Sequence, residues 1–275
     1  MEKEKILFVT QEITPYLPEN KISKIGRYLP QGMQERGCEI RTFMPRFGNI
    51  NERRNMLHEV IRLSGMNMVI YNTDHPLIIK VASIQSARMQ VYFIDNDDFF
   101  KRKFTLTDDK GNLFPDNDER CIFYARGVLE TVKKLRWAPD IIHCHGWFSA
   151  LVPLYVKKAF KEDPIFDHSK IIFSIYDQEF KGSLNKDFIK KIPIDDISSK
   201  DIKIIENPTY TNLIKLAIQY SDAVVLGDKN INSEIIEYIN QQEKRFIHHT
   251  EDENFTDAYN EFYDNIIEKK YIEEF

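Results

Sequence analysis

The chain has 275 residues, 42% of them hydrophobic and 12% aromatic, so it can bury a substantial core, and wholesale disorder is excluded. Its formal net charge of −5 and its lack of a Lys/Arg-rich run argue against a nucleic-acid groove. Three widely spaced cysteines do not form a disulfide framework and indicate a reducing compartment. Neither a signal peptide nor a run of the roughly 20 apolar residues that span a bilayer is recognisable. We therefore expect a cytoplasmic protein without membrane contact.

The first part of the chain has the pattern of a β-α-β unit. An apolar run at 6–9 is followed by helical apolar spacing over 22–36 and by a second strand over 38–44. Gly37 is placed to end the helix. Strands that are apolar on both faces are typical of parallel sheets covered by helices.

Residues 57–82 interrupt this alternation. Apolar runs at 68–71 and 76–81 flank a turn at 72–75 and predict a small β excursion. A third core strand is predicted over 89–94, and residues 108–118 have the composition of a loop.

The second half of the chain returns to alternating elements. Helices are predicted over 118–135, 148–160, 210–220 and 232–239, and strands over 140–144, 170–176 and 223–226. This order predicts an α/β fold with a Rossmann-like, doubly wound and mostly parallel sheet. We assign residues 1–240 to this domain. Residues 241–275 are expected to form a docked C-terminal helical tail, whose apolar face carries Phe255, Tyr259, Phe262 and Ile266.

Polar clusters follow four of the predicted strands. They are Gln11-Glu12, Asp95-Asn96, His143-Cys144-His145-Gly146-Trp147 and Tyr176-Asp177. In open α/β sheets, ligands bind outside the carboxyl ends of the strands. We therefore expect these clusters to converge on one site.

His143 and His145 stand at positions i and i+2, where a strand gives way to a helix. Imidazole suits zinc or iron, but Cys144 should point away from both rings, and we expect neither a metal nor a cofactor. A neutral imidazole can donate to a sugar hydroxyl, and Trp147 offers a flat apolar face. A structural role for both histidines, in the core or as caps, stays open.

Other kinds of site have weaker support. Lys21, Lys24 and Arg27 lie near the start of the first helix and could attract an anion, although we favour a solvated helix face. The sequence contains no G-x-S-x-G elbow, so a serine hydrolase is unsupported.

Several segments resemble, in the same order, the glycogen and starch synthases of bacteria and plants. Residues 139–151, P-D-I-I-H-C-H-G-W-F-S-A-L, are similar to that family's P-D-hydrophobic-hydrophobic-H-x-H-D-W-x-x-x-L segment. Residues 5–16 resemble its opening strand and turn. Further similar motifs follow at 29–30, 35–41, 44–47, 92–96, 116–120 and 220–224.

The resemblance implies the N-terminal half of a GT-B glycosyltransferase, which transfers glucose from ADP-glucose to an α-1,4-glucan with retention. It implies three catalytic candidates, namely His145, His143 and Asp116. It also implies a substrate-binding set, namely Asn117, Trp147, Tyr176, Asp177 and Glu12. The implied partners are α-glucan, ADP-glucose and either a second copy of the chain or a separate synthase chain.

The sequence departs from the family where the donor would bind. The family's K-T-G-G-L-A-D turn corresponds here to P-E-N-K-I-S-K at 18–24, without the glycines that let a backbone approach a phosphate. Gly146 replaces the acid of H-D-W, and Tyr176-Asp177 stands where the family has His-Asn.

The nucleotide-binding half, whose positive groups would stabilise a leaving ADP, has no counterpart in these residues. We therefore expect a synthase-type domain that is incomplete on its own. A non-catalytic glucan-binding module, or a regulatory docking module, is the alternative.

Overall fold

The computed structural model describes residues 3–194, 196–251 and 255–267. The strands are β1 Lys5–Thr10, β2 Glu39–Pro45, β3 His58–Glu59, β4 Met66–Ile70, β5 Thr73–Ile84, β6 Met89–Asp95, β7 Ile141–His145, β8 Lys170–Ile175, β9 Ala223–Leu226 and β10 Arg245–His248. The α-helices are α1 Lys21–Glu35, α2 Asp97–Phe100, α3 Asn117–Leu135, α4 Val152–Lys157, α5 Phe188–Lys191, α6 Tyr210–Tyr220, α7 Ser233–Gln241 and α8 Phe255–Ile267. Short 3-10 helices lie at Gln85–Ala87, Trp147–Ser149 and Lys203–Ile205.

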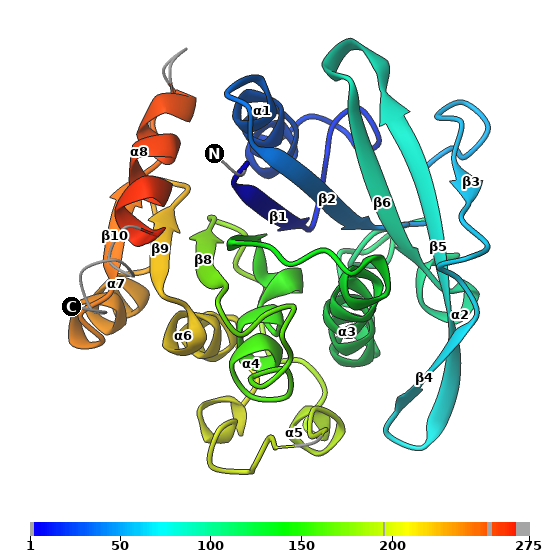
Figure 1. The fold of residues 1–275 in the computed structure, drawn as a ribbon. Coiled ribbons are helices and arrows are strands. Elements are labelled where there is room, and N and C mark those ends of the chain that lie inside the picture. The colour runs from blue at the N-terminus through cyan, green and yellow to red at the C-terminus, as the bar shows by residue number, and fades with distance from the viewer. Residues whose placement is uncertain (1–2, 195, 252–254, 268–275) are drawn as a thin grey trace.

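The strands form one sheet in the order β10-β9-β8-β7-β1-β2-β6-β5-β3, with β4 paired to β5 (Figure 1). From β10 through β6 every neighbouring pair is parallel. Strand β5 runs antiparallel to β6, and both β3 and β4 run antiparallel to β5. The predicted doubly wound, mostly parallel Rossmann-like sheet is confirmed, and β3, β4 and β5 form the β excursion.

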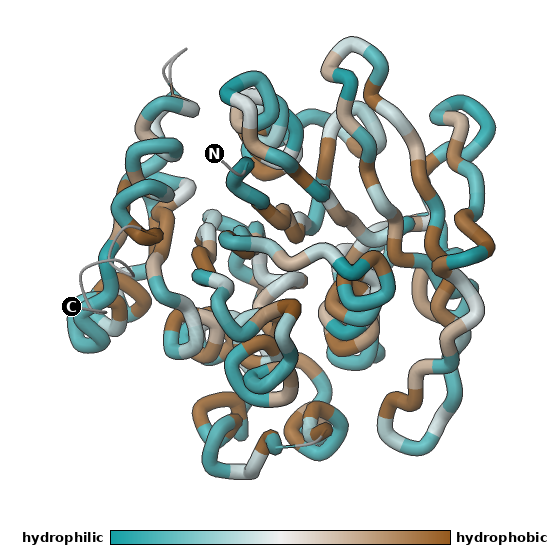
Figure 2. The backbone as a smooth tube through the Cα atoms, in the orientation of Figure 1, coloured by the Kyte–Doolittle hydropathy of each residue, from teal (hydrophilic) through white to brown (hydrophobic). Residues whose placement is uncertain are grey.

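Helices cover both faces of the sheet. Helices α1 and α8 lie on one face, and α3, α4 and α6 lie on the other (Figure 1). Successive side chains of β1 alternate between the two cores: Ile6 and Phe8 pack with α1 and α8, whereas Leu7 and Val9 face the larger core. Figure 2 shows the hydrophobic stretches along the central strands and hydrophilic residues on the outer turns.

Helix α1 packs closely against the turn after β1. A Cβ atom at Gly26 would lie 2.6 Å from the carbonyl oxygen of Glu12, so only glycine permits this approach. As predicted, Gly37 follows the helix end, with φ +96°.

Two predicted element boundaries are wrong. The helix expected over 148–160 is a 3-10 turn followed by the six-residue helix α4, and Pro153 in its first turn has no N–H to continue a helix from the preceding residues. The turn expected at 72–75 lies earlier, where Tyr71 adopts φ +55°, and Thr73 already begins β5.

The last segment contains an element that was not predicted. Strand β10 extends the sheet at its edge beside β9, and its side chains are mostly exposed. A four-residue edge strand, R-F-I-H, is too short to show an apolar periodicity. Helix α8 then returns to α1 and buries Tyr259, Tyr263 and Ile266. The division near residue 240 stays a prediction, and residues 252–254 and 268–275 of the predicted tail lie outside the described residues.

Candidate functional site

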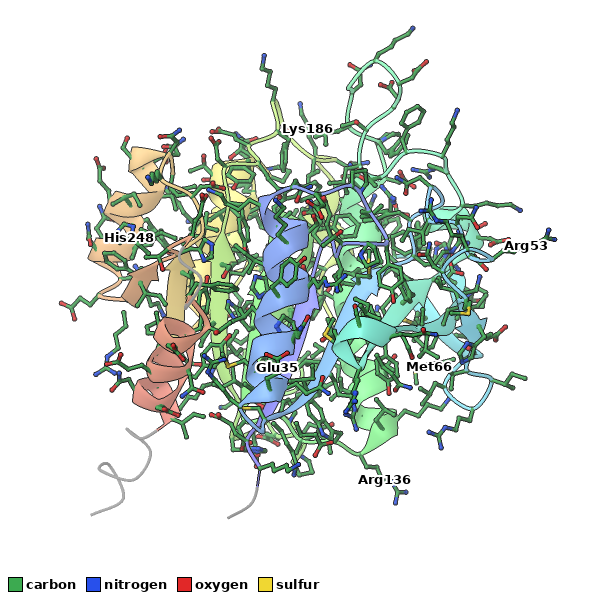
Figure 3. The ribbon with its side chains drawn as sticks, turned by 90° about the horizontal axis from the view of Figure 1, so that it is seen from above. Glu35, Arg53, Met66, Arg136, Lys186 and His248 are labelled. Carbon is green, nitrogen blue, oxygen red and sulfur yellow. The ribbon has the colours of Figure 1, made fainter. Side chains whose placement is uncertain are left out.

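The strand order reverses between β1 and β7. After β1 the chain continues toward β2 and β6, and after β7 it continues toward β8 and β9. Such a switch point is where open α/β sheets bind ligands, outside the carboxyl ends of the strands. Figure 3 shows Lys186, in the segment after β8, at the end of the molecule opposite to Glu35 and Arg136.

A cavity of about 690 Å³ opens at this switch point, and we call it the switch-point cavity. Its lining residues come from the turns after β1, β7 and β8 and from the loop before α3: Gln11, Glu12, Leu106, Thr107, Gly111, Asn112, Leu113, Trp147, Gln178, Glu179, Phe180 and Lys181. Two predicted substrate-binding residues, Glu12 and Trp147, line it.

Gln11 joins the floor of this cavity to three segments. Its Oε1 accepts a hydrogen bond from the Phe148 backbone N–H at 3.2 Å. Its Nε2 donates to Glu12 Oε1 at 3.1 Å and to Gln178 Oε1 at 3.3 Å. The sequence predicts the Gln11-Glu12 cluster, but of the two residues only Glu12 belongs to the predicted substrate-binding set. The signal for Gln11 was its place directly after a buried strand.

Aromatic rings form one side of the cavity. The rings of Trp147 and Phe180 meet edge to face, with centroids 4.9 Å apart, and Phe180 also contacts Tyr210. Phe180 is half-buried, so part of its ring faces the open space. Its neighbours are amides and carboxylates, a combination that suits the apolar faces and the hydroxyl groups of a sugar.

The two predicted catalytic histidines lie on the α1/α8 face of the sheet, and both are fully buried. His143 Nδ1 is 2.6 Å from Tyr263 Oη, and its Nε2 is 2.7 Å from Ser174 Oγ. Both ring nitrogens of His143 thus have hydrogen-bond partners within the chain. This geometry favours a structural role for His143 in the core. As expected, Cys144 points into the opposite core.

His145 lies beside His143, with ring centroids 4.0 Å apart. Its Nδ1 is 2.8 Å from Tyr176 Oη, whereas its buried Nε2 has no hydrogen-bond partner among the described residues. Burial, together with His249, lowers the pKa of His145 to about 3, so the ring is neutral near pH 7. Contact between His145 and a transferred glucose stays a prediction.

Tyr176 and Asp177 line a different cavity, of about 280 Å³. Tyr210 Oη donates to the Tyr176 carbonyl at 2.6 Å and ties α6 to this turn. The Asp177 side chain is exposed, and its backbone N–H donates to Asp228.

Asp116 and Asn117 lie behind the wall of the switch-point cavity. Asp116 pairs with Arg102, whose Nη1 is 2.6 Å from its carboxylate. Asn117 is fully buried and bonds to Arg120 and to the Leu106 carbonyl. The structure therefore distributes the eight predicted residues over four places.

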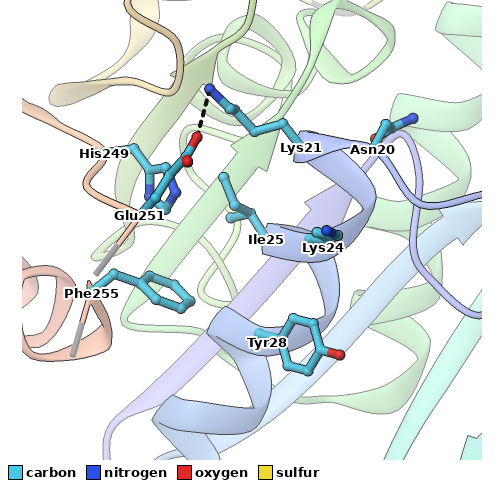
Figure 4. A pocket seen from close by; sticks show the side chains of 8 residues that line it. All are labelled: Asn20, Lys21, Lys24, Ile25, Tyr28, His249, Glu251 and Phe255. Atoms are coloured by element: carbon cyan, nitrogen blue, oxygen red, sulfur yellow. Dashed lines mark ion pairs between the residues drawn. The ribbon is translucent and has the colours of Figure 1, made fainter. Parts of the chain in front are cut away.

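A third cavity, of about 500 Å³, lies between the start of α1 and the segment before α8 (Figure 4). Lys21 Nζ lies there, 2.5 Å from Asp228 and 3.2 Å from Glu251. The hydrogen bond to Asp228 is the main cause that raises the pKa of Lys21. Asn20 caps the helix through the Ser23 backbone N–H. An anion at this helix start would have to displace carboxylates.

Gly146 joins β7 to the cavity with φ +81° and ψ 160°, a conformation that is essentially restricted to glycine. A Cβ there would lie 2.6 Å from Ile22 Cδ1. We expect Gly146→Ala to lower the free energy of unfolding by about 1–3 kcal/mol in urea titrations. Gly182→Ala, also at φ +81° but with open space around it, should have a smaller effect. Equal losses would show that the contact with Ile22 is unimportant.

Two kinds of site have no support in the part of the chain that the structure describes. Among those residues, no group of three or more His, Cys, Asp or Glu side chains is placed to hold a metal ion. None of their helices combines the length and apolar character needed to cross a bilayer.

Comparison with known proteins shows which chains share this sequence and fold. A family model described as the starch synthase catalytic domain matches residues 5–248. The glycogen synthase of Chlorobium luteolum is 32% identical over 233 residues, which cover 84% of this chain and 47% of that protein. The glycogen synthase of Chlorobium phaeobacteroides is 32% identical over 276 residues, which cover 97% of this chain and 56% of that protein.

A solved structure gives the same fold at low sequence identity. The catalytic domain of starch synthase IV from Arabidopsis thaliana, bound to ADP and acarbose, matches with a TM-score of 0.73 and 17% identity. The match covers 90% of this chain and 51% of that one. The chain thus spans about half the length of the curated relatives it matches.

Proposed function

Because the chain belongs to the starch synthase catalytic domain family, we propose that it forms the glucan-binding half of a glycogen-synthase-type glucosyltransferase. The switch-point cavity binds an α-1,4-glucan. Glucose comes from ADP-glucose, held by a nucleotide-binding half in the same polypeptide or in a separate one. His145, His143 and Asp116 stay the proposed catalytic set.

The observation that carries this proposal is the composition and place of the switch-point cavity. It lies at the reversal of strand order, where α/β sheets bind ligands. Phe180 offers apolar ring surface and is supported edge to face by the buried Trp147, and Glu12, Gln178 and Asn112 offer hydrogen-bonding groups. In the Arabidopsis relative, ADP and acarbose are bound together.

Binding is tested by calorimetry with maltoheptaose. We expect the wild-type chain to bind, and Phe180→Ala to weaken binding about tenfold through lost ring contact. Phe246→Ala removes a ring that is 38% exposed on β10 and outside the cavity, so it should leave affinity unchanged. Equal affinity of the wild type and Phe180→Ala would place the glucan elsewhere.

Transfer is tested with ADP-glucose and glycogen. We expect no ADP release by the chain alone, and release once the C-terminal half of the Chlorobium phaeobacteroides glycogen synthase is added. His145→Ala should abolish that release. ADP release by the chain alone would contradict the proposal that it needs a nucleotide-binding half for glucose transfer.

Glucan binding that never leads to transfer would instead identify a non-catalytic glucan-binding or docking module. The observation that favours this second candidate is the pairing of Lys21 with Asp228 and Glu251, which places two carboxylates beside a cation that donor phosphates would need at the start of α1.

The partner and the location belong to the same proposal. We propose association with a second copy of the chain or with a synthase chain, and light scattering that finds only monomers would exclude the former. A cytoplasmic location is supported by the free thiols of Cys38, Cys121 and Cys144.

A further inference from the structure

The loop 101–116, between α2 and α3, forms one wall of the switch-point cavity. Leu106, Thr107 and Leu113 contribute to that wall. The tip is closed by a bridge between Thr107 and Leu113, and Asp108 accepts from the backbone N–H groups of Lys110 and Asn112. The tip is thus held together internally, so its position depends on how its base is attached.

Arg120, one turn into α3, makes that attachment although it is fully buried. Its Nη2 donates to the Thr105 carbonyl at 2.8 Å, and its Nε donates to the Phe99 carbonyl at 2.8 Å. The rings of four phenylalanines surround the guanidinium, with centroids 5.3–5.7 Å from its central carbon: Phe47, Phe100, Phe114 and Phe148. A buried charge that donates to one carbonyl of the loop and to one of α2 fixes backbone geometry more rigidly than an apolar side chain would.

Asn117 continues the attachment toward the cavity. Its Oδ1 accepts from Arg120 Nη1 at 2.6 Å, and its Nδ2 donates to the Leu106 carbonyl at 2.8 Å. Leu106 itself lines the cavity. The chain of contacts from α3 to the cavity wall therefore runs through two hydrogen bonds, and both functional groups of Asn117 are used in it.

We propose that Arg120 and Asn117 are positioning residues that hold the 101–116 loop in the shape that binds the acceptor glucan, without touching the glucan. This proposal rests on the proposed function and changes the role of Asn117 from substrate contact to support. Two observations carry it: both polar atoms of Asn117 are engaged within the chain, and each residue donates to a loop carbonyl.

The test measures loop exchange and glucan affinity on the same variants. Asn117→Asp keeps an acceptor for Arg120 but loses the donor to Leu106, so the fold should persist while the loop loosens. Arg120→Lys cannot reproduce the three-way donation. In both variants we expect amide hydrogen exchange in 101–116 to accelerate about tenfold, and the Kd for maltoheptaose to rise about tenfold.

Arg126→Lys is the matched control. Arg126 also extends from α3, but it donates to the Val69 carbonyl at the end of β4, away from the cavity. In Arg126→Lys, faster amide hydrogen exchange around Val69 should leave the affinity for maltoheptaose unchanged.

Four outcomes would overturn the proposal. A looser loop with unchanged Kd would show that its position does not matter for binding. A weaker Kd with unchanged loop exchange would make Asn117 a direct contact. Unchanged loop exchange and unchanged Kd in both variants would show that Arg120 and Asn117 do not hold the loop in place. A wild-type chain that does not bind maltoheptaose overturns the proposed function, and the inference with it, whatever the loop exchange shows.

Discussion

Replacing Lys191 with methionine should lower the free energy of unfolding by about 3–5 kcal/mol. Its Nζ lies 2.8 Å from Asp118 and 2.6 Å from Glu119, and the Asp118 side chain is completely buried. Burial lowers the pKa of Lys191, but the hydrogen bonds to the two carboxylates outweigh it and leave the pKa above its ordinary value. Without the ammonium, Asp118 keeps a buried charge without compensation or takes up a proton.

Lys190→Met is the control for this change. The two lysines are neighbours in α5, but Lys190 is 65% exposed and pairs with an exposed Asp187, so water screens the interaction and its loss should change stability little. The double variant Lys191→Met with Asp118→Asn should recover part of the loss, because it also removes the buried charge. Urea titrations followed by circular dichroism give the free energy of unfolding of the wild type, of the two single lysine variants and of the double variant. A loss below 1 kcal/mol for Lys191→Met would mean that water reaches Asp118.

The Lys191 contacts also stabilise the segment that follows β8. Helix α5 has only four residues, so its own hydrogen bonds hold it weakly. Lys191 attaches it to α3, and the Ile192 carbonyl accepts from Tyr155 Oη at 3.2 Å. Because Phe180 and Lys181 belong to the same long connection, loosening of α5 should also disturb the cavity wall.

The fold was largely predictable because its central strands are apolar on both faces. Such runs have few alternatives to a covered parallel sheet, and β1, β7 and β8 appear where they were expected. Strand β10 was not predicted, because a short and mostly exposed edge strand shows no hydrophobic pattern in the sequence. The helix expected after β7 failed because Pro153 constrains local structure more strongly than the apolar spacing does.

The site was less predictable, for a reason that His143 shows. The sequence placed it at the end of a strand, but its partner Tyr263 is 120 residues away in α8. No local pattern reveals which sheet face such a late helix covers. Glu12 and Trp147 were predictable, because the turns after β1 and β7 must meet at the switch point. Phe180 and Leu106 were missed because they lie in long connections without periodicity.

Acidification should destabilise the chain through its two buried histidines. Burial and the neighbouring His145 hold the pKa of His143 well below its ordinary value, and burial lowers that of His145 to about 3. In the unfolded chain both titrate near pH 6.5. Below that pH the unfolded state binds protons that the native state does not, so the free energy of unfolding falls as the pH falls. The expected loss from pH 7 to pH 5 is about 2 kcal/mol per histidine, and about 4 kcal/mol for both.

Other titratable groups surround His143 and His145, and their own pH dependence has to be separated from that of the two histidines. Tyr259 and Tyr263 face the pair from α8, Ser174 from β8, Tyr176 from directly after β8, and His249 from beyond β10. Burial raises the pKa of the three tyrosines, so they stay neutral throughout this range. Burial and Lys21 lower the pKa of His249, which adds a loss of the same sign.

A variant comparison separates the histidines from every other titrating group. Asp118, whose pKa is raised mainly by burial, has the opposite effect, because it binds protons more readily in the native state. His145→Asn should therefore reduce the loss between pH 7 and pH 5 by about 2 kcal/mol, whatever its effect at pH 7. The exposed His58→Asn should leave the loss unchanged. If His145→Asn keeps the full pH dependence, His145 is protonated in the native state. Protonation would require water or a carboxylate to reach Nε2, which has no hydrogen-bond partner among the described residues.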